Sequence, residues 1–301
     1  MKKFLLKVLF FFTCVVVMDF VLGCAFSWFR CHAKGGSTAN CEYIANQSKD
    51  DVIILGSSRA AHHYIPQIIV DSLGISCYNC GEEGNGIILA YGRYKMLTER
   101  YMPKIILYEI TPDYDYLARE DNAKFLGYLR QYYSKKCIRD LFDDFDDQWS
   151  NLKMCSKMYQ NTQKLLPNII DNIIYRDNRK GYAPLYGKID VNKTKPAVDR
   201  PFEIDTLKLS YIEQLIKDAQ KNEIPLLFMI SPRYNENEDL SKYEPVLLLC
   251  QKYNVPFLNF KNYKPIALNP EYFQDIGHMN SKGAEAYTNM LVREVLNNYL
   301  E

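Results

Sequence analysis

A run of four apolar residues, Val52–Leu55, is the feature that most constrains how this chain can fold. The run is rich in β-branched side chains, does not alternate with polar residues, and is bounded by Asp51 and Gly56. Such a run is typical of a parallel strand that is buried on both faces of a sheet. Open α/β sheets carry their sites just beyond the carboxyl ends of the strands, where Ser57 and Ser58 follow here. Two interpretations of this turn remain open, a nucleophilic hydroxyl and a helix-capping serine.

Further short apolar runs recur along the chain and alternate with segments of helical periodicity. This alternation predicts an α/β domain in which a central parallel sheet of five strands is covered by helices on both faces, a flavodoxin-like three-layer sandwich. The expected strands are Val52–Leu55, Ile75–Asn79, Lys104–Ile110, Pro225–Ile230 and Pro256–Asn259. The expected helices cover residues 67–73, 87–101, 205–219, 243–253 and 281–300.

The first 29 residues differ from the rest of the chain. Three lysines precede Val8–Phe29, a run of 22 residues in which Asp19 is the only charge. About 20 apolar residues in a helix cross the hydrocarbon core of a membrane, and basic residues ahead of them favour a cytoplasmic N-terminus. We expect one uncleaved transmembrane helix in the cell membrane, with the remainder of the chain outside the cytoplasm. Lipidation at Cys24 and a cleaved signal peptide are the alternatives. A charged side chain such as Asp19 is energetically costly inside a membrane-spanning helix, so we expect Asp19 to have a polar partner or to lie near the membrane–water interface.

The remaining residues are expected to form one domain behind a linker. Residues 30–50 are polar and predict a juxtamembrane linker, and 51–301 predict the α/β domain. The looser pattern at about 114–201 predicts a helical or loop insertion. A net charge of +1 with scattered charges argues against a nucleic-acid partner. The spacing of Cys77 and Cys80 suits either buried core cysteines or a redox pair, and no Cys/His spacing typical of a metal site occurs.

A second candidate motif, Asp275-x-x-His278, lies on the loop before the last helix. A carboxylate that accepts from one imidazole nitrogen leaves the other nitrogen free to take a proton from a hydroxyl. This is the arrangement that activates a serine nucleophile. Taken alone, the motif also fits a capping or surface histidine.

Three motifs together resemble the SGNH (GDSL-like) hydrolase superfamily from about Asp51 to the C-terminus. They are Gly56-Ser57-Ser58, Asn79-x-Gly81-x-x-Gly84-Asn85 and Asp275-x-x-His278. The chain is most similar to membrane-anchored bacterial members that open with Gly-Ser-Ser-Arg. The resemblance implies that Ser58 is the nucleophile, that His278 is the general base and acid, and that Asp275 orients it. It also implies an oxyanion hole built from the backbone N–H groups of Ser58 and Gly84, and no cofactor.

The chain departs from the family at its third block, which usually reads Gly-x-Asn-Asp. Here the third strand ends in Glu109-Ile-Thr-Pro-Asp113, without the asparagine that donates to the oxyanion. An ionised Asp113 would repel that charge. Asn85 is one substitute, a hole with two donors is another, and an inactive site is the third alternative.

Three side chains near these motifs are candidates for substrate binding, namely Arg59, His63 and Asp113. For Arg59 the alternative is a surface ion pair, and for His63 and its neighbour His62 it is packing under the insertion. The resemblance implies an esterase or O-acyltransferase that acts on acyl esters, with acetyl esters of an exported or cell-surface polysaccharide as the expected substrate. The alternative is a weak or inactive protein that binds glycan or a partner membrane protein during polysaccharide assembly.

Overall fold

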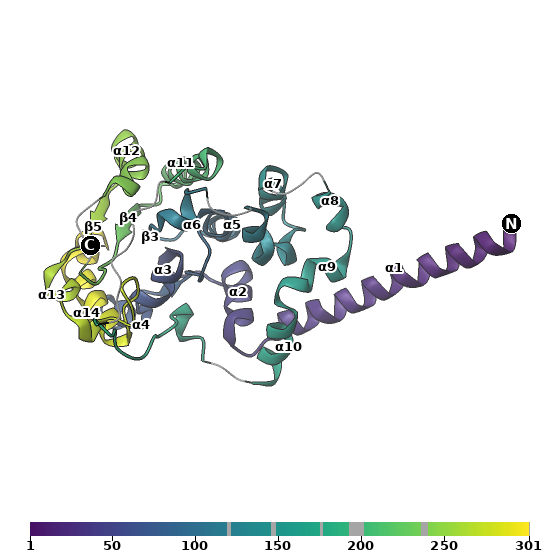
Figure 1. The fold of residues 1–301 in the computed structure, drawn as a ribbon, viewed down its shortest axis with the longest axis horizontal. Helices are drawn as coiled ribbons and strands as arrows, with labels where there is room; N and C mark the ends of the chain where they lie inside the picture. Colours follow the sequence, from purple (N-terminus) through teal and green to yellow (C-terminus); the bar gives the residue numbers. More distant parts are fainter. Residues whose placement is uncertain (119–121, 146–148, 175–176, 193–201, 236–239, 301) are drawn as a thin grey trace. The chain divides into compact units, whose positions relative to one another are not determined.

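The computed structural model describes residues 1–118, 122–145, 149–174, 177–192, 202–235 and 240–300 (Figure 1). The chain divides into two compact units. Met1–Asn46 and Asp121–Asn178 form the helical unit, whereas Gln47–Glu120 and Arg179–Glu301 form the sheet unit. The segment expected as an insertion at about 114–201 is therefore divided between the two units. Its middle belongs to the helical unit, together with the N-terminal residues, and its two ends belong to the sheet unit.

Five parallel strands form the centre of the sheet unit, in the order β2-β1-β3-β4-β5. This order confirms the predicted α/β fold with a five-stranded parallel sheet. The register places Gly56, the last residue of β1, beside Glu109, the last residue of β3. The strands are β1 (Val52–Gly56), β2 (Cys77–Asn79), β3 (Ile105–Glu109), β4 (Leu226–Ile230) and β5 (Phe257–Asn259).

Every residue of β1, β3 and β4 is buried, which explains why their sequences do not alternate. Val52 and Ile54 pack in one apolar cluster with Tyr287 and Leu291 of the last long helix, so the intervening residues face the opposite layer. Each such aliphatic side chain contributes about 1.5–3 kcal/mol when it leaves water. Both faces of the strands therefore have to be apolar.

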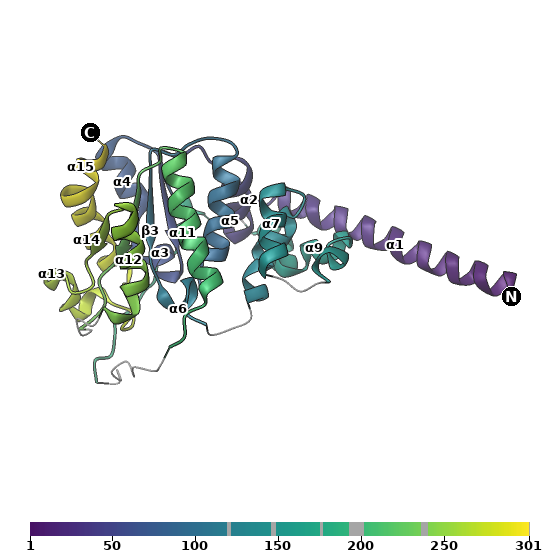
Figure 2. The ribbon, with the colours of Figure 1, turned by 90° about the horizontal axis from the view of Figure 1, so that it is seen from above.

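Helices cover both faces of this sheet (Figure 2). On one side α3 and α4 contact α14, and on the other α11 packs between α5 and α12. The long helices are α4 (Pro66–Leu73), α5 (Ile87–Thr98), α11 (Thr206–Lys221), α12 (Glu244–Tyr253) and α14 (Ser281–Leu291). The short ones are α3 (Ser58–His63), α6 (Pro112–Asp115), η3 (Arg179–Gly181), η4 (Ser241–Tyr243), α13 (Lys264–Ala267), η5 (Pro270–Tyr272), η6 (Val292–Leu296) and α15 (Asn297–Leu300).

Local signals explain where these helices begin. Asp205 caps α11 by accepting from the backbone N–H of Lys208 at 3.0 Å. Asn280 caps α14 by accepting from Lys282 and Gly283, both at 3.1 Å. Each cap satisfies backbone N–H groups that the first turn of a helix leaves without partners.

The two cysteines of the Cys-x-x-Cys motif are free and buried. Burial raises the pKa of the Cys77 thiol well above its ordinary value. Because the thiolate is the reactive form, this environment favours a core role over redox chemistry.

The helical unit consists of helices alone among its described residues. Its N-terminal helix α1 (Lys2–Cys31) is the one described helix that is long and apolar enough to cross a membrane. The segment expected as a linker contains α2 (Gly36–Asn46), which packs against α1. The other members are η1 (Asn122–Tyr132), α7 (Lys136–Phe145), α8 (Ser150–Lys153), α9 (Lys157–Asn161), η2 (Thr162–Lys164) and α10 (Leu165–Ile173).

Candidate active site

The turn after β1 presents Ser58 as the first residue of α3. Gly56 makes this turn possible, because its φ of 138° lies where side chains are strained. A Cβ on Gly56 would also lie 2.5 Å from the carbonyl oxygen of Glu109 on the neighbouring strand. The close approach of β1 and β3 therefore requires glycine immediately before the two serines.

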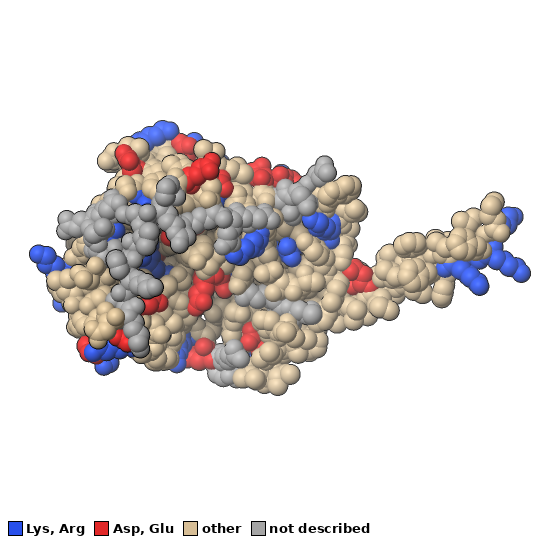
Figure 3. All heavy atoms as spheres, viewed as in Figure 1, with Lys and Arg blue, Asp and Glu red and all other residues tan. Residues whose placement is uncertain are grey.

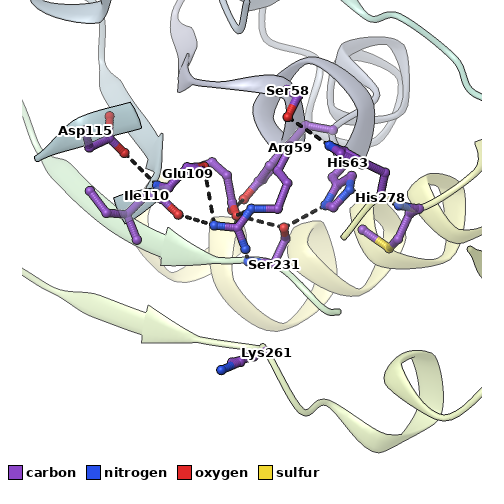
Figure 4. Close-up of polar contacts among 12 residues, drawn as sticks. Ser58, Arg59, His63, Glu109, Ile110, Asp115, Ser231, Lys261 and His278 are labelled. Carbon is purple, nitrogen blue, oxygen red and sulfur yellow. Dashed lines mark hydrogen bonds and ion pairs between the residues drawn. The ribbon is translucent and has the colours of Figure 1, made fainter. Parts of the chain in front are cut away.

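Ser58 meets His278 although 220 residues separate them (Figure 4). The Ser58 hydroxyl lies 2.8 Å from Nε2 of His278. On the other side of the ring, Nδ1 lies 3.0 Å from Oδ2 and 3.1 Å from Oδ1 of Asp275. The three side chains that the sequence singled out thus form one continuous hydrogen-bonded chain.

The partners of the imidazole determine which nitrogen carries the proton. The Asp275 carboxylate only accepts, so Nδ1 of His278 donates to it and Nε2 accepts from the Ser58 hydroxyl. Burial opposes ionisation of Asp275, but its bonds from the His278 ring and from the backbone of Gly277 and His278 outweigh burial and lower its pKa. Asp275 is therefore an anion at neutral pH, as a group that orients and stabilises an imidazolium must be.

The loop after β2 carries the expected backbone donor. Gly84 has a φ of 65°, a left-handed conformation that favours glycine. No described heavy atom lies within 4 Å of the position that a Cβ on Gly84 would take. The backbone conformation, and not crowding, is thus the reason for glycine here. Asn85 is buried and its amide donates to the Glu83 carbonyl at 2.9 Å, so one of its two N–H groups already has a partner.

Arg59 is buried beneath the site and does not face solvent. Its Nε lies 3.3 Å from Oε1 of Glu109, and its guanidinium also donates to the backbone oxygen of Ile110 (Figure 4). Arg59 thus holds the ends of β1 and β3 together. The suggestion that it contacts substrate is not supported by this placement, because Glu109 already balances its charge inside the protein.

A chain of buried polar groups connects Glu109 to the loop of His278. Oε1 of Glu109 accepts from the Ser231 hydroxyl at 2.8 Å, and that hydroxyl lies 2.7 Å from Nδ1 of His63. Nε2 of His63 in turn accepts from the backbone N–H of Met279 at 3.0 Å. Of the two interpretations of His63, its burial and these contacts support packing over substrate binding. These contacts also let His63 hold the backbone of Met279, the residue next to His278.

Glu109 and Ser231 were not among the predicted site residues, although the sequence contains a signal for them. Each is a polar residue at the end of a buried apolar strand, β3 and β4. Burial raises the pKa of Glu109, whereas Arg59, Tyr64 and Ser231 oppose this. All three residues contact the carboxylate, and burial still leaves its pKa above the ordinary value.

The segment after β3 contains the acidic residues that stand in place of the missing asparagine. Asp113 is half-buried in the first turn of α6. Its neighbour Asp115 is buried and accepts from the Tyr108 hydroxyl at 2.7 Å and from the Thr111 backbone at 2.6 Å. Burial raises the pKa of Asp115 to about 7. Asp115 therefore anchors the turn after β3.

His62 reaches the loop that carries Gly84. Its Nδ1 lies 2.6 Å from the Ala183 carbonyl and its Nε2 lies 2.9 Å from Oε1 of Glu83. Both partners are hydrogen-bond acceptors, and they hold the His62 ring from both sides. The pair ties α3 to the residue directly before Gly84.

No family model and no curated protein matches this sequence. Its structural neighbours are SGNH (GDSL-like) esterases and lipases of low identity. A GDSL-like lipase from Bacteroides thetaiotaomicron is 12% identical, with a TM-score of 0.36 over 90% of this chain and 100% of that one. A mutant of Axe2, an acetylxylan esterase from Geobacillus stearothermophilus, is 11% identical, with a TM-score of 0.41 over 84% of this chain and 97% of that one. Because these identities and TM-scores are low, the assignment of the fold is based on the strand order of this chain itself.

Proposed function

We propose that this chain is a membrane-anchored serine esterase or O-acyltransferase of the SGNH type, with Ser58 as its nucleophile. One observation carries the proposal, the hydrogen-bonded chain from Ser58 through His278 to Asp275 at the carboxyl end of β1. Distances of 2.8 and 3.0 Å lie within the range in which a base takes a proton from a nucleophile.

The proposed reaction has two halves. Ser58 Oγ attacks the carbonyl carbon of an ester while Nε2 of His278 takes its proton, and Asp275 stabilises the imidazolium. His278 then gives that proton to the oxygen of the leaving alcohol as the carbon–oxygen bond breaks, which leaves the acyl group on Ser58. In the second half a water molecule or a sugar hydroxyl gives its proton to Nε2 of His278 and attacks the acyl carbon. As the bond from that carbon to Ser58 Oγ breaks, His278 gives the proton to the serine, and the acyl group leaves as an acid or as a new ester.

The backbone N–H groups of Ser58 and Gly84 are proposed to stabilise the negative oxygen in both halves. The third donor of the family, an asparagine after β3, has no counterpart in Glu109–Asp113. Loss of one such donor lowers turnover by roughly 10²–10³. A slow enzyme, or one that depends on a substrate group for the third contact, is the expected consequence.

We further propose that the acyl group is acetyl and that the substrate is an exported or cell-surface polysaccharide. The side chains of His278 and Asp275 are 31% and 56% exposed, which suits a long polar substrate better than a lipid tail that has to be enclosed. The apolar helix α1 supports a place at the cell membrane, where such polymers are modified. A partner membrane protein of polysaccharide assembly would supply the acyl donor or the acceptor.

A fluorophosphonate probe that reacts with activated serines tests the nucleophile. We expect it to label the wild-type chain and not Ser58→Ala. Ser57→Ala is the matched control, because Ser57 is buried and, among the described residues, its hydroxyl has no hydrogen-bond partner. Equal labelling of wild type and Ser58→Ala would refute the assignment. Mass spectrometry of an acetylated oligosaccharide would then distinguish hydrolysis from transfer.

A second candidate function is binding without catalysis, and the missing asparagine is the observation that favours it. A protein that only binds glycan or a partner would keep its cellular effect after Ser58→Ala and His278→Ala. An esterase would lose that effect in both variants.

A further inference from the structure

One stripe of α1 packs against the helical unit along its C-terminal half. The carboxylate of Asp19 accepts from the backbone N–H groups of Lys157 at 2.8 Å and Met158 at 3.3 Å, and from the Ser156 hydroxyl, at the beginning of α9. Asp19 thus acts as a cap for another helix, which explains a charge within an otherwise apolar run. One turn further along, a Cβ on Gly23 would lie 2.4 Å from Cβ of Lys157.

These contacts continue to the C-terminal end of α1. The amide of Asn161 lies 3.3 Å from the Ser27 hydroxyl, so residues 19, 23 and 27 lie on one face with a spacing of four. Past this stripe, Asn172 of α10 donates to the Phe29 carbonyl. Helices α9 and α10 are therefore fixed beside residues 19–29 of α1.

The part of α1 that precedes these contacts is too short to cross a bilayer by itself. Between Lys7 and Asp19 lie the 11 uncharged residues Val8–Met18, about 16 Å at the rise of an α-helix. Phe20, Val21 and Leu22 are also exposed, so the apolar surface of α1 continues past its first contact with α9. The hydrocarbon core is about 30 Å thick. Figure 3 shows no acidic or basic side chain on the visible face of α1 along its middle. If α1 crosses the membrane, the next residues of the span, and the short helices fixed to them, lie at the depth of the outer hydrocarbon or of the headgroups.

Those short helices turn apolar side chains outward. Leu166, Ile170, Ile173 and Ile174 are exposed, with Ile173 at 77%, and their spacing places them on one side of α10. Asp171, by contrast, is buried and accepts from the backbone N–H of Thr38 at 3.1 Å. Helix α10 thus contacts α2 through the polar side chain of Asp171 and exposes an apolar stripe. A helix whose outer face meets water usually has the opposite arrangement, with polar residues outside.

The two tryptophans of the chain lie in the same unit. Trp28 is in α1, Trp149 directly precedes α8, and both are more than half exposed, as is Leu152 of α8. Tryptophan is enriched where membrane and water meet, because its ring is apolar and its N–H is polar. One exposed tryptophan in the candidate span and one before α8, in the same unit as the apolar stripe of α10, indicate a lipid interface.

We propose that the helical unit lies partly in the membrane that α1 spans. Trp149, Leu152 of α8 and the apolar stripe of α10 contact the headgroups and the upper acyl chains of a phospholipid bilayer. The proposal rests on α1 as a membrane anchor. A bilayer fits this surface better than a second copy of the chain, because α9 and α10 are bound to residues 19–29 of α1, which a span that begins at Val8 needs in order to cross the outer half of the membrane.

Brominated lipids, which quench tryptophan fluorescence at a known depth, test the proposal on the full chain in phosphatidylcholine vesicles. In Trp28→Phe the remaining Trp149 should lose about half its emission when bromine lies near the headgroup, and less when it lies near the methyl ends. Its emission should also lie at shorter wavelength than that of tryptophan in water. Trp149→Phe reports in the same way on Trp28.

A third variant separates the anchor from the interface. Phe12→Trp, made with both native tryptophans replaced by Phe, should be quenched most by bromine near the methyl ends. If the tryptophan introduced at position 12 is quenched and Trp149 is not, the anchor stands and the proposed interface is wrong. If Trp149 emits at shorter wavelength than tryptophan in water but is not quenched by bromine, it is covered by protein and not by lipid. That result would equally overturn the lipid proposal. If position 12 is not quenched, the anchor fails and the interface with it, while labelling of Ser58 on the same sample reports separately on the chemistry.

Discussion

His63 connects a buried carboxylate to the backbone beside His278. The Met279 N–H can only donate, so Nε2 of His63 accepts and Nδ1 carries the proton towards Ser231. The ring is therefore held neutral. Burial, helped by the nearby charges of His278 and Arg59, lowers the pKa of His63 well below its ordinary value.

This pKa shift predicts that acid destabilises the sheet unit through His63. The unfolded chain protonates this histidine near pH 6.5 and the folded chain does not, so the unfolded state binds more protons below that pH and stability falls. Between pH 6.5 and 5.5 the loss from this group approaches about 1 kcal/mol. His63→Gln, which keeps a donor and an acceptor, should remove this component from the pH dependence of thermal unfolding. The exposed His32→Gln is the control, and an unchanged pH profile in His63→Gln would contradict the prediction.

Asp275 is predicted to act through charge and orientation. Asp275→Asn keeps the shape of the side chain but presents an N–H group, which favours the wrong tautomer of His278 for accepting from Ser58. The rate of fluorophosphonate labelling should fall by roughly 10²–10⁴ while Ser58 remains the labelled residue. A rate within about twofold of wild type would show that the carboxylate does not support the base. Gln274→Asn, on the same loop, is the matched control.

At the scale of elements, the contact between α1 and α9 depends on the absence of a side chain at Gly23. Gly23→Leu would force the two helices apart, since Cβ alone would meet the backbone and the side chain of Lys157 at 2.4–2.9 Å. Overpacking of this kind typically costs about 1–3 kcal/mol. Hydrogen exchange of residues 157–173 should accelerate in this variant. Val21→Leu, which puts the same side chain at an exposed position of α1, should leave exchange unaltered.

A second feature at this scale is the short helix α3, whose six residues include the candidate nucleophile, a partner of Glu109 and two histidines that bind neighbouring loops. Its first residue carries the candidate nucleophile, its second binds Glu109, and its last two bind the loops of Gly84 and Met279. Because α3 is tied on several sides, the position of Ser58 depends on packing more than on the helix itself.

At the scale of the whole molecule, the lysines before α1 predict a cytoplasmic N-terminus and a sheet unit on the other side of the membrane. Full-length chain in intact spheroplasts should be degraded by external protease, and a tag ahead of Lys2 should be protected. Extraction at alkaline pH should leave the chain with the membrane fraction. Release into the soluble fraction, together with a shortened N-terminus, would instead indicate cleavage of the leader.

The sequence alone predicted the strands of the central sheet, the long helices that cover it and the residues of the candidate triad. Strand and helix periods are local, so Val52–Leu55 and its repeats predicted a five-stranded parallel sheet that the structure confirms. Ser58, Asp275 and His278 were singled out by short motifs at a strand end and in a loop, and the resemblance of three such motifs to the SGNH family assigned their roles. A short motif can be recognised in the sequence without knowing what packs around it.

Tertiary structure alone decided which polar groups face inward and which distant segments pack together. Arg59 changes from a candidate substrate contact to a buried partner of Glu109, since the register of β1 and β3 brings the two together. Residues 36–46 become a helix of a separate unit, because Thr38 binds Asp171, 133 residues later. Such contacts depend on how the elements close around one another, and no local pattern records them.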